Sequence, residues 1–87
     1  MIERVVTIRN EMGMHARPAA QFVRMAATFD ANIEIDREGT AVNGKSIMGV
    51  MMLAAECGCD LVLRADGTDA EAAVSALADL IERGFGE

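Results

Sequence analysis

Two stretches of the chain have the side-chain pattern of half-buried β-strands. Residues 2–9 are rich in β-branched side chains and place Val6 and Ile8 on the same face. Residues 60–65 (DLVLRA) predict a second strand, which ends before an Asp-Gly pair that is typical of turns.

A hairpin is predicted over residues 32–42. Its first half, NIEID, alternates strictly, so that Ile33 and Ile35 are expected in the core and the intervening carboxylates in water, namely Glu34 and Asp36. The next three residues predict a tight turn in which Gly39 is free to adopt a positive φ, and Thr40–Val42 predict a short return strand.

The first helix is predicted from Ala16 onward. Apolar residues recur there at spacings close to three and four, which predicts a buried helix face formed by Ala19, Phe22, Val23, Ala26 and Ala27. Pro18 falls in the first turn, where the missing N–H has little effect.

Two further helices have start signals in the sequence. Ser46 precedes IMGVMMLAA and is a good N-cap for a short helix that Gly49 weakens. Thr68 and Glu71 have capping-box spacing, and a helical repeat of apolar residues follows, at Val74, Leu77, Ala78 and Ile81. Gly84 is placed to end this helix.

The order of these elements is strand, helix, strand, strand, helix, strand, helix. The order predicts an α+β domain in which the helices cover one face of a small sheet. The hairpin supplies at least one antiparallel pair of strands.

Composition limits the classes of protein. Eighty-seven residues (9.3 kDa) suffice for one domain, residues 1–87, with a core of aliphatic side chains, because only 3% of residues are aromatic. A formal net charge of −6 argues against a nucleic-acid partner. No apolar run approaches the roughly 20 residues that span a bilayer, and the charged first residues do not resemble a signal peptide, so we expect a cytoplasmic protein without membrane insertion.

The two cysteines, Cys57 and Cys59, are one residue apart and no second ligand pair exists in the chain. We interpret them as reduced thiols near a helix end, with a metal or redox role as the alternative. We expect neither a metal nor a bound cofactor.

The only histidine, His15, precedes the first predicted helix in the segment GMHARPAA. At the N-cap its ring would lie beside the free backbone N–H groups of Ala16 and Arg17, at the positive end of the helix dipole. A neutral imidazole is a nucleophile, and these donors together with the Arg17 guanidinium would hold a phosphoryl group that the ring had accepted. On this motif alone, a histidine that only caps a helix or lies on the surface is the more frequent case.

A second motif changes that balance. GMHARPAAQFV and NGKSIMGVMMLAA, about thirty residues further on, together resemble the histidine-containing phosphocarriers of the bacterial phosphoenolpyruvate-dependent sugar phosphotransferase system, the HPr family. The resemblance covers essentially the whole chain. It implies an open-faced β-sandwich, in which a four-stranded antiparallel sheet is covered on one face by three helices in the order β-α-β-β-α-β-α.

The resemblance also implies a function. His15 would accept phosphate on Nδ1 from phosphorylated enzyme I and pass it to the A domains of sugar-specific transport components, with assistance from Arg17. Ser46 would be the target of a serine kinase and phosphorylase. The alternative is a purely structural role, because serine is a preferred N-cap residue. The chain would act as a monomeric phosphoryl carrier rather than a stand-alone enzyme.

Residues around the site are expected to meet these partners. Methionines at helical spacing are usually core residues, but a short helix cannot bury every face, and we predict that Met48 and Met52 are exposed contacts. The other predicted partner contacts are Arg24, Lys45 and Ile47. Two alternatives stay open: a paralogue in a regulatory, nitrogen-type phosphotransfer branch, and a regulatory module that acts through phosphorylated Ser46 with His15 idle.

Overall fold

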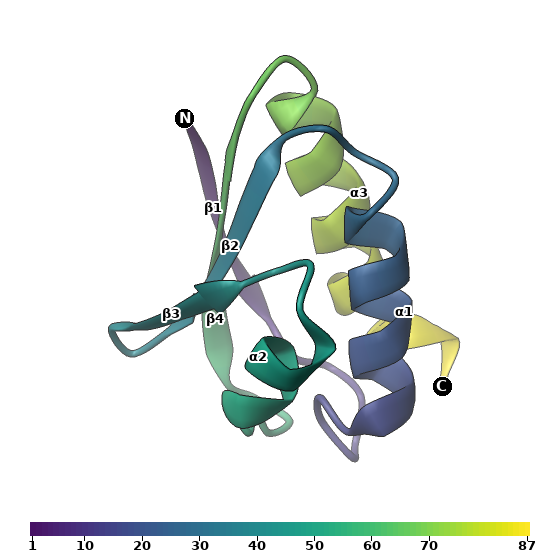
Figure 1. Ribbon diagram of the computed structural model, residues 1–87. Coiled ribbons are helices and arrows are strands. Elements are labelled where there is room, and N and C mark those ends of the chain that lie inside the picture. Colours follow the sequence, from purple (N-terminus) through teal and green to yellow (C-terminus); the bar gives the residue numbers. More distant parts are fainter.

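The computed structural model describes all 87 residues and contains four strands in one antiparallel sheet (Figure 1). The strand order across the sheet is β1-β4-β2-β3. All three neighbouring pairs are antiparallel. The strands are β1 (Ile2–Thr7), β2 (Asn32–Arg37), β3 (Thr40–Asn43) and β4 (Asp60–Asp66).

Three helices cover one face of this sheet, as Figure 1 shows, and a 3-10 turn (Gly84–Gly86) follows the last of them. α3 packs on β1 and β4, and α1 lies beside α3 and α2. The predicted fold class, an α+β open-faced sandwich, is confirmed. The helices are α1 (Ala16–Ala26), α2 (Ile47–Met52) and α3 (Ala70–Glu82).

The core lies between the sheet and the helices, and the strand residues predicted from the alternating pattern are buried there. Val6 and Ile8 are 1% exposed, and Ile35 is fully buried. The expected face of α1 is largely correct, because Ala19, Phe22 and Ala26 are fully buried, although Ala27 lies beyond the helix and is exposed. The expected face of α3 is fully confirmed, at Val74, Leu77, Ala78 and Ile81.

Asp36 is a correction to the predicted hairpin, because it is only 9% exposed rather than in water. One carboxylate oxygen accepts from the backbone N–H of Gly39 at 2.9 Å, and the other pairs with Arg64 Nη1 at 2.9 Å. Arg64 also contacts Glu3 and Glu34. The hydrogen bond from Arg64 to Asp36, followed by the one to Glu3, raises the pKa of the guanidinium. A buried carboxylate is stable here because it is paired and hydrogen-bonded.

The start of α3 is a second correction. The N-cap is Asp69, not Thr68, and its carboxylate caps no helix N–H. It accepts instead from the backbone N–H groups of Asp30 and Ala31, each at 2.8 Å, and so joins α3 to the loop after α1. The hydrogen bond from Asp30 is the main cause of the lowered pKa of Asp69.

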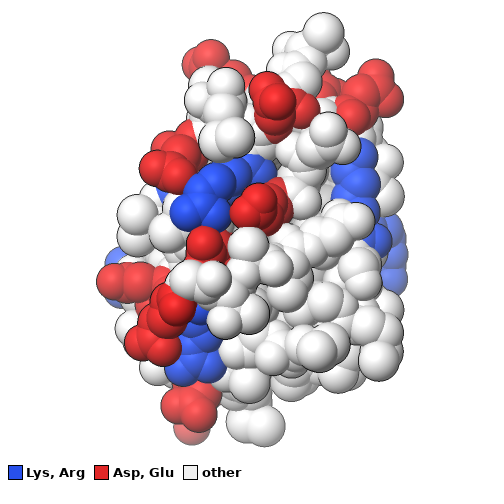
Figure 2. All heavy atoms as spheres, turned by 60° about the vertical axis from the view of Figure 1, so that its left-hand side comes forward, with Lys and Arg blue, Asp and Glu red and all other residues white.

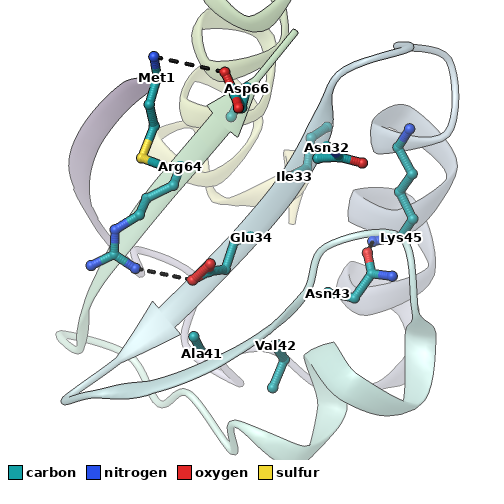
Figure 3. A pocket seen from close by; sticks show the side chains of 11 residues that line it. Met1, Asn32, Ile33, Glu34, Ala41, Val42, Asn43, Lys45, Arg64 and Asp66 are labelled. Carbon is teal, nitrogen blue, oxygen red and sulfur yellow. Dashed lines mark hydrogen bonds and ion pairs between the residues drawn. The ribbon is translucent and has the colours of Figure 1, made fainter.

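The open face of the sheet is rich in acidic side chains. Figure 2 shows Asp and Glu gathered on the left and upper parts of this face, around the basic groups, and a broad area without charge at the lower right. A hollow of about 530 Å³ lies along the sheet where Arg64 meets Glu34 and the N-terminal amine meets Asp66 (Figure 3). No residue of the His15 segment lines it.

Candidate functional site

His15 occupies the N-cap of α1, as the sequence predicts. Its backbone is extended (φ −79°, ψ −172°), and its carbonyl accepts the N–H of Ala19 at 3.0 Å, which begins the helix. The imidazole makes no capping hydrogen bond and its side chain is 37% exposed. The ring is therefore not used to cap the helix, and it is accessible to a partner molecule.

One nitrogen of this ring faces a carboxylate that the sequence analysis did not identify. His15 Nε2 lies 3.0 Å from Oε2 and 3.3 Å from Oε1 of Glu87. Because a carboxylate can only accept, Nε2 must carry the proton of this hydrogen bond. In the neutral ring, Nδ1 then holds the lone pair.

The C-terminal strap, residues 84–87, brings Glu87 to this position. Figure 1 shows the C-terminus beside the first turns of α1. Three successive residues have positive φ: Gly84 (67°), Phe85 (58°) and Gly86 (77°). Phe85 is a strained residue in this region, and burial of its ring, which is 4% exposed, compensates. The strap closes when the N–H of Glu87 donates to the carbonyl of Gly84 at 3.0 Å.

Asn10 connects the strap to the loop that carries His15. It is 6% exposed, and its Nδ2 donates to the carbonyl of Gly13 at 2.6 Å and to Oε1 of Glu87 at 3.1 Å. The same carboxylate thus contacts a buried amide and the imidazole. This arrangement fixes the side chain of Glu87 relative to the ring.

A second segment, residues 54–59, forms backbone hydrogen bonds with the chain on the N-terminal side of His15. The N–H of Met14 donates to the carbonyl of Ala55 at 2.8 Å. Ile8 exchanges two backbone hydrogen bonds with this segment, to Cys59 and from Gly58. Both cysteines are free thiols, Cys57 exposed and Cys59 half-buried, and they lie beyond α2 in this supporting segment.

The first turn of α1 offers two backbone donors. Pro18 has no N–H and the N–H of Ala19 is used by His15, so the amides of Ala16 and Arg17 are the ones without a helical partner. Arg17 is exposed and forms no ion pair within the chain. These groups are available to an anion beside His15.

The structure does not bring the other predicted basic residues to His15. Arg24 is exposed in the last turn of α1, roughly 13 Å along the helix from His15 at 1.5 Å per residue. Lys45 is half-buried, and its Nζ donates at 2.7 Å to the carbonyl of Phe29, beyond the same end of α1. A ring of positive charge close around His15 is therefore absent.

Ser46 caps α2, as predicted, and its Oγ accepts the N–H of Gly49 at 3.1 Å. The helix is shorter than the apolar run and has a single buried residue, Val50. The exposed apolar face of α2 is defined by Ile47 (41% exposed), Met48 (68%), Met51 (41%) and Met52 (76%). The predicted exposure of Met48 and Met52 is confirmed, and Met51 joins them.

The fold and the site define a class of protein: an open-faced α+β sandwich that presents one partly exposed imidazole at the start of a helix. A family model described as "PTS HPr component phosphorylation site" matches residues 2–83. The chain belongs to the HPr family, the phosphocarriers of the phosphotransferase system.

Individual relatives agree over the full chain. The phosphocarrier protein HPr of Cupriavidus necator is 45% identical over 87 residues, covering 100% of this chain and 98% of the relative. The corresponding protein of Treponema pallidum is 46% identical, with 100% and 99% covered. A crystal structure of HPr from Thermoanaerobacter tengcongensis is 47% identical and superimposes with a TM-score of 0.96, covering 100% of this chain and 98% of that one.

Proposed function

We propose that His15 accepts a phosphoryl group on Nδ1 from phosphorylated enzyme I and passes it to the A domains of sugar-specific transport components. The observation that carries this proposal is the contact of Glu87 with Nε2, which leaves Nδ1 as the nucleophile. The membership in the HPr family supports the reaction class.

The transfer step needs three contributions from the chain. The Nδ1 lone pair forms a bond to phosphorus while the bond from phosphorus to the donor group breaks. The imidazole gains positive charge in this step, and the Glu87 carboxylate, 3.0 Å from Nε2, offsets it. The reverse sequence returns the phosphoryl group to an acceptor and the ring to its neutral form.

The phosphoryl group would rest at the N-terminus of α1. The free amides of Ala16 and Arg17 supply hydrogen-bond donors, and the exposed Arg17 guanidinium neutralises charge on the phosphoryl oxygens. The same cation stabilises the transition state of phosphoryl transfer. A site this open holds the group weakly enough to release it.

Partners would dock on the exposed apolar face of α2 and on α1 beside it. Ile47, Met48 and Met52 supply adaptable apolar contact area for several unlike partners. Residues 46–55 contain no charged side chain. Arg24 and Lys45 would contact the acidic rim of a partner at the far end of α1.

Phosphorylation of Ser46 by a serine kinase would weaken this docking. A phosphate adds a charge of about −1.5 to −2 at the N-terminus of α2, where the helix tolerates it. The six residues of α2 span about 9 Å, so this charge would lie next to the docking face. An acidic partner would then be repelled without a change of fold.

Phosphate transfer from phosphoenolpyruvate through enzyme I tests the proposal. We expect acid-labile phosphate on the wild-type chain, none on His15→Ala, and the coupling pattern of Nδ1-phosphohistidine in nuclear magnetic resonance spectra. Phosphate on any other residue, or on Nε2, would contradict it. Competition between A domains of sugar transporters and those of a regulatory branch identifies the acceptor.

We also propose that the chain works as a monomer in the cytoplasm, where two free thiols are stable. Similar solved structures include an HPr dimer from Thermoanaerobacter tengcongensis and a swapped dimer of Crh from Bacillus subtilis. None of the helices is long and apolar enough to traverse a bilayer. Sedimentation at micromolar concentration distinguishes a monomer from such dimers.

A further inference from the structure

The exposed apolar face of α2 contains three thioethers that phosphoryl transfer does not use. Met48, Met51 and Met52 occupy positions i, i+3 and i+4, so they lie on one side of the helix. Their side chains are 68%, 41% and 76% exposed, whereas Met14, next to His15, is 5% exposed. Three exposed thioethers are therefore clustered on the docking face, and the other two exposed methionines, Met1 (81%) and Met12 (74%), lie outside α2.

Chemical change on this face would not disturb the core. Val50 is the only buried residue of α2. The ends of the helix are held by groups other than the methionines, because Ser46 accepts from Gly49 and Arg37 Nη1 donates to the carbonyls of Leu53 and Ala54. A polar group on the three methionines would thus alter the surface and leave the fold intact.

We propose that Met48, Met51 and Met52 form an oxidation site, at which a peroxide converts thioethers to sulfoxides and reduces binding of enzyme I. The inference rests on the proposed function, because that function makes this face a docking surface. A sulfur lone pair attacks one oxygen of hydrogen peroxide, an S–O bond forms and the O–O bond breaks. The second oxygen leaves as hydroxide, which takes the proton from the oxygen bound to sulfur and becomes water. Sulfur is oxidised by two electrons and the peroxide is reduced.

The effect on binding follows from the polarity of the product. A thioether packs against apolar partner atoms, whereas a sulfoxide oxygen is a strong acceptor that must lose its water in the same contact. The change is reversible, since methionine sulfoxide reductases restore the thioether. Docking would therefore respond to peroxide while Nδ1 of His15 keeps its reactivity.

The test compares the full-length chain before and after hydrogen peroxide treatment, with catalase added to stop the reaction. Peptide mass spectrometry is expected to locate added oxygen on the three methionines of α2, and also on the exposed Met1 and Met12, but not on Met14. In the enzyme I assay, we expect KM for this chain to rise about tenfold, as when one important interface residue is lost, with kcat nearly unchanged. The thermal unfolding midpoint should stay the same, and a methionine sulfoxide reductase should restore KM.

Two variants separate this site from other oxidisable groups, each compared with its own untreated sample. The triple variant M48L/M51L/M52L is expected to lose its sensitivity to peroxide. Met12→Leu, which removes a thioether that is 74% exposed outside α2, should keep full sensitivity. Equal sensitivity of the triple variant would overturn the proposal, as would recovery with dithiothreitol alone, which reduces oxidised thiols at Cys57 and Cys59 but not sulfoxides. Failure of the proposed function would show separately, as absence of phosphate on untreated chain.

Discussion

Gly13 is the position at which one methyl group should most disturb the proposed phosphorylation site. Its φ is +69°, and a Cβ built there would lie 2.4 Å from the carbonyl oxygen of Ala55 and 3.0 Å from Cα of Glu56. Both atoms are backbone, so no side chain can rotate away. The same carbonyl of Ala55 accepts the N–H of Met14, which immediately precedes His15.

The free-energy change for Gly13→Ala has three sources. A left-handed conformation destabilises alanine by about 1–2 kcal/mol. Displacing the supporting segment resembles overpacking, which costs about 1–3 kcal/mol, and the hydrogen bond from Met14 contributes about 0.5–1.5 kcal/mol. We therefore expect a loss of about 3–6 kcal/mol in the free energy of unfolding.

Gly39→Ala is the matched control. Gly39 also has a positive φ (+90°), but a Cβ there meets no atom within 4 Å. This variant therefore has the conformational cost of a positive φ without the close contact to the backbone of residues 55 and 56. Its free energy of unfolding should fall by about 1–2 kcal/mol. In a domain of this size each kcal/mol lowers the midpoint by about 4–8 °C.

Thermal and urea unfolding, followed by circular dichroism, measure both variants under the same conditions. We expect Gly13→Ala to unfold at least 8 °C below Gly39→Ala, roughly the shift for 2 kcal/mol. At temperatures where both are folded, Gly13→Ala should also accept phosphate more slowly, because the His15 loop has moved. Equal midpoints for the two variants would refute the claim that residues 54–59 fix the position of the loop.

Three further results are expected. Glu87→Gln should slow phosphorylation of His15 by about two- to tenfold, the range of one hydrogen bond, in the enzyme I assay, whereas Glu82→Gln should not. Ser46→Ala should lower the free energy of unfolding by about 1 kcal/mol in urea titrations, through loss of the cap. Because the pKa of Asp69 is lowered on folding, stability should fall as pH drops below about 4, and Asp69→Asn should flatten this dependence in acid titrations.

Local patterns were sufficient to predict most of the fold. The alternation at Ile33 and Ile35 and the helical repeat ending at Ile81 locate buried faces, because each depends only on near neighbours in sequence. The exposure of Asp36 was predicted wrongly for the opposite reason. Its burial depends on Arg64, a partner from a strand 28 residues away.

In the candidate site, too, the residues set by local sequence were predicted and the one brought in from a distant part of the chain was not. His15, Ala16 and Arg17 follow from one motif and a helix start, and the structure places them together at the N-terminus of α1. Glu87 lies 72 positions from His15, and no local pattern relates the two residues. A signal did exist in the glycines on either side of Phe85, which permit the positive φ values of the strap.

The limited packing of α2 has a consequence for the proposed phosphorylation of Ser46. The serine oxygen accepts a hydrogen bond from Gly49, so a catalyst that binds residue 46 in an extended conformation has to break this bond. Val50 is the only buried residue within the helix, and Leu53 and the hydrogen bonds from Arg37 hold its end, so we expect α2 to unwind more readily than the sheet, α1 and α3. If such a kinase acts here, it would select a transiently extended segment around residue 46, and rapid amide hydrogen exchange in α2 would report how often that segment becomes available.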